Sequence, residues 1–465
     1  MKKKVVYVLM IALVATTGCK KFLSVEPKFK FSDTQAINDI DGLNKTVTGI
    51  YSQLQSSNLY GGGMIANDEL MADWVQTGAV ADFSLNQLVS RQLNAYNSVS
   101  GGVWNDAYRA INMCNIVLAN LSKFESTNPA DVQLARGRCY FVRGLMHFEL
   151  LRHFAQASGF TADDSHLGIP LRLDVGDAQN GQATPRSTVA QCYAQIASDL
   201  EQAAQILPAS DPTYATKYAA QGILAKVYFT QHKYDKAIEW SEKVMDGTYK
   251  LNDSLPAVYS SGDGAANKEM LFQVMNLATD KDNGVLRSRF VDKASASTTL
   301  PLYTMFPGYF TQLLAAQQTV GDLRATVLFP KKFVKYYVCQ KYSYNYDLNT
   351  PVLRYAEILL IHSESLIETG GSELQARSDY NLIRTRAGLL PDNTTSGKAA
   401  LLAAVRQERD MELAMEGDRL FEVRRRQSQY VSAAGTFNWN EQRLIYPIPQ
   451  GEVDANNNMV QNPGY

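Results

Sequence analysis

The sequence predicts a mostly α-helical protein, with a tetratricopeptide-like scaffold of about four helical hairpins and a loop-rich, partly β insertion. Two observations predict this fold class. Apolar residues recur at spacings of three and four along most of the chain, as they do on one face of a helix. Residues 251–350 break that pattern, because they are rich in Gly, Ser, Thr, Asn and Asp. We therefore expect a rigid helical scaffold that carries one irregular region.

The first 18 residues have the layout of a secretory signal peptide. A positive start at Lys2–Lys4 precedes an apolar run from Val5 to Ala15, which is shorter than the about 20 residues that span a bilayer. The run ends in Thr16-Thr17-Gly18-Cys19, which resembles a bacterial lipobox, so we expect acylation of Cys19. An ordinary secretory signal with an incidental cysteine is the alternative. Residues 19–33 then form a lipidated tether, and the acyl chains anchor the protein to the membrane.

Residues 34–250 form the first helical region. Its first helix is predicted over Gln35–Leu54, and later stretches with the same apolar spacing start at Trp104, Phe141 and Val189. Ser187 follows a proline and precedes the last of these stretches, so it is the expected N-cap of that helix.

Two stretches predict helical hairpins directly. Residues 215–250 resemble a tetratricopeptide unit of about 34 residues, in which small residues such as Ala220 and Ala225 let two helices approach closely. Tyr355–Arg386 has the same pattern, with Gly370-Gly371 between its helices. A single hairpin cannot bury its apolar face alone, so we expect four hairpins side by side, two of them less regular.

The insertion over residues 251–350 is the candidate ligand-binding surface. Its short β-like runs at Met270–Val274 and Lys332–Val338 predict strands. Irregular segments held on a rigid scaffold commonly carry binding residues, so this region is expected to contribute to a binding site.

Composition and motifs exclude several function classes. Lys and Arg number 45 against 46 Asp and Glu, and this balance argues against a nucleic-acid-binding protein. The sequence has no nucleophile elbow, zinc-protease helix, dinucleotide-binding glycine pattern or phosphate loop. His147 and His153 lie six apart, which does not place two metal ligands on one helix face. We therefore expect no catalytic residue, no metal and no cofactor, although carboxylate pairs for glycoside hydrolysis stay open because their separation is spatial.

Four cysteines remain besides Cys19, and three connectivities would be available to them. Buried free thiols are the preferred interpretation, because all of them except Cys339 lie in apolar helical patterns. They are Cys114, Cys139, Cys192 and Cys339.

A charged stretch near the end of the chain predicts ion pairs. On a helix, Arg406 faces Asp410 and Arg409 lies three before Glu412, which are pairing distances. Glu412 and Glu416 are like charges four apart and need cationic partners. Arg419 and Arg424 are the candidates, and a solvated charged face is the alternative.

Two closing segments carry a family resemblance. They are the stretch from Val405 to Arg425, and Tyr446-Pro447-Ile448-Pro449 with the terminal Gln461–Tyr465. Together they resemble the closing signature of the SusD/RagB family, surface lipoproteins of Bacteroidota. The resemblance covers nearly the whole chain, with residues 351–465 as its C-terminal region, and also includes Gly168-Ile169-Pro170. One departure is His362-Ser363-Glu364-Ser365, where the family usually has small apolar residues around the glutamate.

The resemblance implies a role in nutrient uptake. It implies an outer-membrane lipoprotein that faces the cell exterior, binds a glycan or oligosaccharide without breaking bonds, and delivers it to a SusC-like TonB-dependent transporter. A peptide ligand occurs in some members of the family. A surface glycoside hydrolase and a scaffold that only organises other proteins are the alternatives. For the charged stretch, the resemblance favours a partly buried network over a solvated face.

Aromatic residues outside the helical pattern are the candidates for stacking on a sugar, because helical hairpins bury their aromatics. Trp74 is the first candidate. It follows Asn67-Asp68, which offer polar groups for sugar hydroxyls, in a region that contributes to ligand pockets in the resembled family. The other candidates lie in the insertion and in a late loop: Tyr303, Tyr309, Tyr342, Tyr344 and Trp439.

Overall fold

A computed structural model gives the fold of the protein. It describes residues 37–78, 82–175, 184–260, 267–275, 284–291, 300–333, 335–343 and 349–465. The predicted signal peptide and tether, with Cys19, lie outside the described residues, and so does Tyr344.

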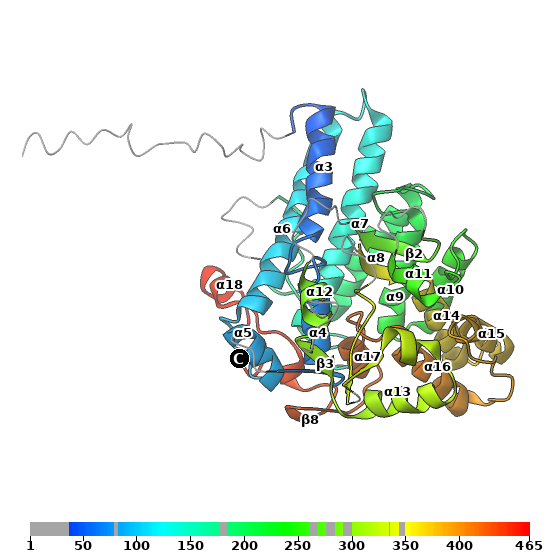
Figure 1. Ribbon diagram of the computed structural model, residues 1–465. Helices are drawn as coiled ribbons and strands as arrows, with labels where there is room; N and C mark the ends of the chain where they lie inside the picture. The colour runs from blue at the N-terminus through cyan, green and yellow to red at the C-terminus, as the bar shows by residue number, and fades with distance from the viewer. Residues whose placement is uncertain are drawn as a thin grey trace, which may run out of the picture.

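Eight helices of the described chain form an array of four hairpins (Figure 1), which confirms the tetratricopeptide-like prediction. The hairpins pair α3 with α6, α7 with α8, α9 with α10, and α14 with α15. Neighbouring hairpins meet where α6 packs on α7, α8 on α9, and α10 on α14. These helices are α3 Ile40–Leu54, α6 Ser98–Asn120, α7 Pro129–Phe154, α8 Val189–Ile206, α9 Lys217–Thr230, α10 Tyr234–Met245, α14 Tyr355–Thr369 and α15 Glu373–Arg386.

Capping side chains set where these helices begin. The N-cap of α8 is Thr188, whose hydroxyl accepts from the Gln191 N–H at 3.2 Å while the Gln191 side chain accepts from the Thr188 N–H at 2.9 Å. The predicted cap, Ser187, is therefore wrong by one residue, because its backbone pairs in extended form with Gly168 and Ile169. Helix α3 likewise begins later than predicted, after Asp39, whose carboxylate accepts from the Gly42 N–H at 2.7 Å.

Small residues allow the close approach of helices that the sequence predicts. Ala220 and Ala225 on α9 are fully buried. At Gly222, on the same helix, an added Cβ would lie 2.5 Å from Leu353 Cδ2 and 3.0 Å from Leu271 Cδ2. The scaffold is thus packed without spare volume where α9 meets strands of the insertion.

Of the four antiparallel two-stranded sheets in the described chain, two join segments far apart in the sequence and two are local hairpins. Strand β2 has the predicted bounds, whereas the run Lys332–Val338 is wrong as a single strand, because its two ends belong to strands that pair with each other. The pairs are β1 Val75–Thr77 with β3 Tyr303–Met305, β2 Met270–Val274 with β6 Thr350–Arg354, β4 Lys331–Lys332 with β5 Tyr336–Tyr337, and β7 Tyr430–Ser432 with β8 Gly435–Phe437.

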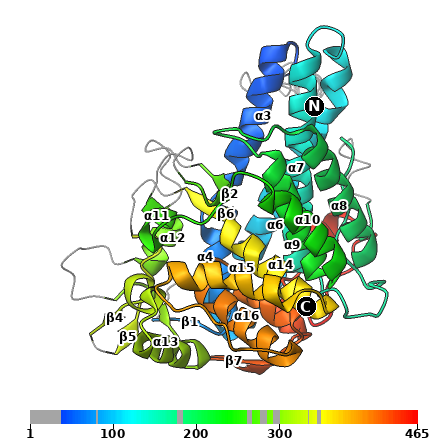
Figure 2. The ribbon, with the colours of Figure 1, turned by 90° about the vertical axis from the view of Figure 1, so that its right-hand side faces the viewer.

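The remaining helices lie beside the array and at its lower end. In Figures 1 and 2, α3 and α7 rise at the upper end, whereas α13 lies at the lower end. Within the described part of the chain, no helix is both long and apolar enough to cross a membrane. The additional helices are α4 Gly63–Met71, α5 Phe83–Ser90, α11 Leu255–Ser260, α12 Gly284–Phe290, α13 Tyr309–Thr319, α16 Lys398–Glu412, α17 Arg419–Arg425 and α18 Gln450–Ala455.

Candidate functional site

Trp74 lies where α4, β1 and α13 meet. Its ring stacks on Phe310 with a centroid distance of 4.4 Å and an interplanar angle of 13°, and the Arg419 guanidinium lies 4.5 Å from its centroid. Only 2% of the residue is exposed. A ligand reaches this ring only if one of its neighbours moves, so the ligand-binding role of Trp74 stays a prediction.

Arg419, at the start of α17, connects Trp74 with a second aromatic candidate. It donates from Nε and one terminal nitrogen to the two carboxylate oxygens of Asp73, at 2.8 and 2.9 Å. Such a two-point bond fixes the orientation of the guanidinium plane as well as its position. The same guanidinium lies 6.0 Å from the Tyr309 ring centroid and 3.8 Å from a carboxylate oxygen of Asp410.

Tyr309 is the first residue of α13 and is 50% exposed. Among the aromatic candidates that lie in the described residues, it is the most accessible. Its hydroxyl donates to Asp410 at 3.4 Å. Burial of the hydroxyl end, together with the Asp410 charge, raises the pKa of Tyr309 to about 12, so the group stays a neutral donor. We call Asp73, Trp74, Tyr309, Asp410 and Arg419 the Tyr309 cluster.

The Tyr309 cluster has the chemistry of a sugar contact. An exposed tyrosine ring offers an apolar face to the C–H groups of a sugar, with a polar tip at its edge. Asp410 and Arg419 lie near Tyr309 and pair with each other at 3.8 Å. Asp410 also pairs with Arg426, whose terminal nitrogen is 3.0 Å away. The cluster therefore combines one accessible ring with a rigid polar base.

Asn67 and Asp68, on α4, are buried. Asp68 accepts from His153 Nε2 at 2.9 Å, while His153 Nδ1 contacts the Glu149 carbonyl at 2.7 Å. Burial by itself lowers the pKa of His153, and Asp68 outweighs that effect, so the pKa is raised. Both partners are acceptors, which suits a doubly protonated ring. Asp68 thus pairs with α7 in this conformation, and its contact with a ligand stays a prediction.

Three further candidates lie outside the Tyr309 cluster. Tyr303 and Tyr342 are 0% and 1% exposed, and both rings pack on Phe290, at 5.4 and 5.5 Å. Tyr303 is buried because β3 pairs with β1 opposite Thr77, a pairing that the irregular composition of the insertion does not reveal. Trp439 follows β8 and is half-buried. The ligand-binding role of these residues stays a prediction.

The closing charged stretch forms a buried ion network, as the resemblance implied. One part is a closed ring of two arginines and two glutamates: Arg354 lies 3.0 Å from Glu412 and also pairs with Glu269, and Arg386 pairs with both glutamates. Each of the four side chains is at most 4% exposed. Burial favours protonation of Glu412, but the surrounding arginines outweigh it and hold its pKa well below the ordinary value.

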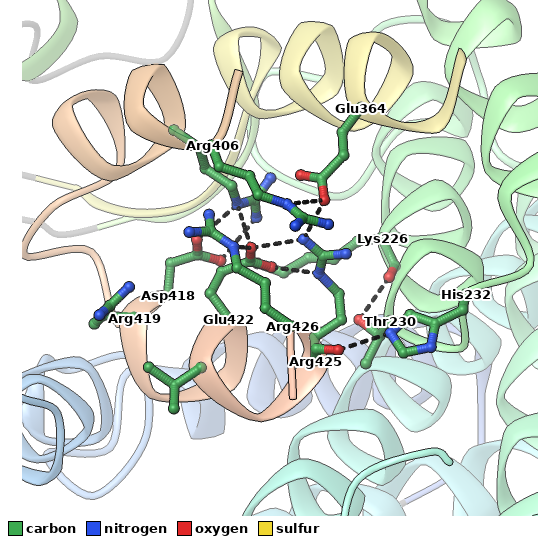
Figure 3. A network of polar contacts seen from close by, with 12 residues as sticks. Lys226, Thr230, His232, Glu364, Arg406, Asp418, Arg419, Glu422, Arg425 and Arg426 are labelled. Carbon is green, nitrogen blue, oxygen red and sulfur yellow. Dashed lines mark hydrogen bonds and ion pairs between the residues drawn. The ribbon is translucent and has the colours of Figure 1, made fainter. Parts of the chain in front are cut away.

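The second part of the network is centred on Glu422 of α17 (Figure 3). Glu422 accepts from Arg425 and from Arg426, each at 2.8 Å. Arg425 also reaches Glu364 on α14 at 2.9 Å, and Arg426 reaches Asp410. Through Asp410 this buried network is continuous with the Tyr309 cluster, which gives the accessible ring a fixed support.

The individual pairs predicted along the helix are wrong. Arg406 pairs with Glu364 and Glu368 on α14, at 2.8 and 3.1 Å, in place of Asp410. Arg409 bonds to Asp418 and Glu357, each at 2.9 Å, in place of Glu412. Helix α16 packs on α14 and α15, so its arginines extend across the interface to other helices and not along their own.

The cationic partners expected for Glu412 and Glu416 are also wrong. Arg419 bonds Asp73, and Arg424 donates to the main-chain carbonyls of Arg152 and Ala155. Glu416 accepts from Lys341 and Arg354 instead. Burial alone would raise the pKa of Glu416. The charges of Arg354 and Lys341 have the larger effect, and the pKa falls from its ordinary value of 4.5 to about 2.

The departure from the family pattern around Glu364 has a local explanation. His362 Nδ1 lies 2.7 Å from Asp379 on α15, and the Ser363 hydroxyl donates to the Ala376 carbonyl at 2.7 Å. These polar contacts join α14 to α15 where small apolar side chains would otherwise pack. The polar run therefore supports the last hairpin.

Cys114, Cys139, Cys192 and Cys339 are buried free thiols in the structure. Burial raises the pKa of Cys192 to about 11, which keeps it in the unreactive thiol form. In the residues that the structure describes, no group of His, Cys, Asp and Glu side chains is arranged to hold a metal ion.

Comparison with known families extends over most of the chain. The model described as the SusD family matches residues 259–465, and the model described as "Starch-binding associating with outer membrane" matches residues 21–229. The chain is also similar to a SusD-like protein of Formosa agariphila, with 22% identity over 519 residues that cover 100% of both chains.

Solved structures share the fold. One protein of Bacteroides vulgatus ATCC 8482, described as a candidate sugar-binding protein, has a TM-score of 0.81 and 26% identity and covers 92% of this chain and 99% of its own. A SusD superfamily protein of Bacteroides thetaiotaomicron VPI-5482 has a TM-score of 0.79 and 22% identity, covering 91% of this chain and 99% of its own. The helical array and its inserted sheets are thus an established architecture.

Proposed function

The chain belongs to the SusD family of non-catalytic binding proteins, and on that premise we propose a specific role in nutrient uptake. It is an outer-membrane lipoprotein that binds a glycan or oligosaccharide and delivers it to a SusC-like TonB-dependent transporter. Family membership supports carbohydrate binding and association with the outer membrane, because the family model that matches residues 21–229 is described as "Starch-binding associating with outer membrane".

The observation that carries the proposal is the joint match of two family models over residues 21–229 and 259–465. The similarity to a candidate sugar-binding protein at 26% identity supports a carbohydrate as the ligand. The Tyr309 cluster supports the same ligand class, because it joins an accessible aromatic ring to carboxylate and guanidinium groups at the ring edge.

Binding in this proposal involves no bond breaking. The exposed face of Tyr309 stacks on the sugar ring, and its hydroxyl, at the edge of the ring, contacts a sugar hydroxyl. Asp410 is held by Arg426, and Arg419 is held by Asp73, so little side-chain freedom is lost when a ligand binds.

Attachment to the membrane rests on Cys19. We expect Cys19→Ala to abolish labelling by radioactive palmitate and to move the protein from the membrane fraction to the soluble fraction. A conservative control is Cys339→Ala, which removes a buried thiol and leaves the lipobox-like stretch intact. Undiminished labelling of the Cys19 variant would refute the lipoprotein part of the proposal.

Delivery to a transporter is tested by affinity capture. A tagged chain purified from its own outer membrane in mild detergent is expected to retain a large TonB-dependent β-barrel. A strain that lacks the chain is expected to take up its glycan more slowly. Recovery of the chain alone, together with unchanged uptake in the deletion strain, would refute the delivery role and favour a binding protein that acts without a transporter.

A further inference from the structure

A hollow lies between the connection from α8 to α9 and strand β2, with a volume of about 370 Å³. This volume falls within the range of small-ligand pockets, roughly 300–1,000 Å³. We call it the β2 hollow. Its lining combines hydroxyl, amide and tyrosine side chains with an apolar part and two charged residues. The polar members include Thr213, Tyr214, Thr248, Tyr249, Asn267 and Gln273, the charged members are Asp211 and Lys268, and the apolar members include Met270, Leu271 and Phe272.

One wall of the β2 hollow is rigidly built. Asp211 pairs with Arg138 at 2.8 Å and accepts from the backbone N–H groups of Thr213 and Tyr214, each at 2.9 Å. Tyr214 is held in turn by the Arg138 guanidinium, 3.7 Å from its ring centroid, and by the Thr48 hydroxyl at 2.8 Å. The connecting loop is therefore fixed before any ligand arrives.

Several polar groups in the lining are left without strong partners. The Gln273 side chain is half-buried, and its only partner in the described structure is the Met275 sulfur, 3.9 Å away, which is a weak acceptor. Within the described residues, neither the Thr213 nor the Thr248 hydroxyl makes a hydrogen bond, and both residues are exposed. These groups offer a donor and acceptor set that protein atoms do not use.

The lining of the β2 hollow contains two charged side chains of opposite sign, Asp211 and Lys268. Asp211 is paired with Arg138 at 2.8 Å, whereas Lys268 is half-exposed and lies 3.9 Å from the exposed Asp253. The lining itself therefore has no net charge that would select an ionic ligand. A neutral ligand rich in hydroxyl groups, with C–H faces for Tyr214 and Tyr249, matches the lining.

We propose that the β2 hollow binds a neutral oligosaccharide, as a second carbohydrate site that shares no residue with the Tyr309 cluster. In both ribbon views β2 lies well above α13, the helix that carries Tyr309 (Figures 1 and 2). The inference rests on the proposed function for the class of ligand. A second point of attachment raises the effective concentration of a long glycan at the protein surface.

The test uses the acylation-deficient full chain and two blocking variants, Thr213→Trp and Thr248→Trp, which place an indole at exposed positions in the hollow. Gln273→Ala removes the amide without filling space. The control Thr436→Trp makes the same substitution at an exposed residue of β8. A microarray of neutral oligosaccharides that includes maltoheptaose selects the probe, and calorimetric titration then measures its affinity. Thermal unfolding establishes that each variant is folded.

Because the Tyr309 cluster stays intact in these variants, we expect both blocking variants to lose one of two sites, so that the calorimetric stoichiometry falls from two probe molecules per chain to one. We expect Gln273→Ala to weaken binding at the β2 hollow without abolishing it, and Thr436→Trp to bind as the wild-type chain does. If the wild-type chain binds a probe and both folded blocking variants bind it equally well, the β2 hollow is not a carbohydrate site, while the proposed function stands. If the wild-type chain binds no carbohydrate on the array, both proposals fail.

Discussion

The first three hairpins and the C-terminal region are held together by different forces. From α3 to α10 the helices meet mainly through apolar side chains and small residues such as Ala220, although the buried Arg143–Asp199 pair also joins α7 to α8. From α14 to α17, buried arginines and glutamates form much of the contact between helices. Apolar packing tolerates exchange of one apolar residue for another, whereas a buried charge that loses its partner is left uncompensated. We therefore expect the C-terminal region to be the less tolerant of single changes.

The largest effect is expected from Arg354→Met. Arg354 pairs with Glu269, Glu412 and Glu416, so its loss leaves three buried carboxylates with fewer cations. Breaking such a buried pair costs about 3–5 kcal/mol of unfolding free energy. Urea unfolding followed by circular dichroism measures it.

The matched control for Arg354→Met is Lys45→Met. Lys45 pairs with Asp41 on α3, and the two side chains are 76% and 69% exposed. Solvent and salt screen a surface pair of this kind, so its loss is expected to change the unfolding free energy little. Equal losses in the two variants would show that the buried network stabilises the fold no more than a surface pair does.

Acid is expected to weaken the C-terminal region. The pKa of Glu416 is lowered to about 2 in the folded chain, from an ordinary value of 4.5. Its contribution to stability is present above pH 4.5 and is lost as the pH falls toward 2, because the unfolded chain takes up the proton first. That contribution is on the order of 3 kcal/mol.

Urea unfolding at a series of pH values from 7 to 2 measures this loss. Glu416→Gln has no charge to lose at that position, so its unfolding free energy is expected to fall less steeply in the acid range. Parallel curves for the wild-type chain and the variant would contradict the assignment of the acid effect to Glu416.

A smaller effect is expected from Gly222→Ala in the helical array. The added Cβ would lie 2.5 Å from Leu353 Cδ2, so the Leu353 side chain must shift within a buried, close-packed region. Overpacking of this kind costs about 1–3 kcal/mol. Gly101→Ala is the matched control, because Gly101 lies in α6 and has no atom within 4 Å of the added Cβ. That control is expected to be neutral or stabilising by up to about 1 kcal/mol.

The smallest effect on stability, with a specific effect on binding, is expected from Tyr309→Ala. The Tyr309 residue is 50% exposed, so removal of its ring leaves the core intact. Trp74→Ala, by contrast, empties a buried position and is expected to lower the unfolding free energy by about 3–5 kcal/mol. Loss of stacking is expected to weaken glycan binding by about 1–3 kcal/mol. Tyr96→Ala, at a residue that is 81% exposed, is the control in the same calorimetric titration. Unchanged affinity in Tyr309→Ala would remove the Tyr309 cluster from the binding surface.

Much of the scaffold was predictable because helices leave a local record in the sequence. The spacing of apolar residues located the hairpins, and Met270–Val274 was located as a strand with its final bounds. The closing signature indicated the family, and through that resemblance a partly buried charge network. Each of these inferences used residues close together along the chain.

The partners of those charges and the accessibility of the aromatic candidates were decided by the tertiary structure. Arg406 bonds to Glu364, 42 positions away, because α16 packs on α14 and not because of spacing along its own helix. Trp74 and Tyr309 have similar irregular surroundings in the sequence, yet only Trp74 stacks on Phe310 and is buried, whereas half of Tyr309 stays exposed. Spacing within one segment encodes local conformation, but burial and charge pairing depend on which segments meet, and that is fixed only when the whole chain packs.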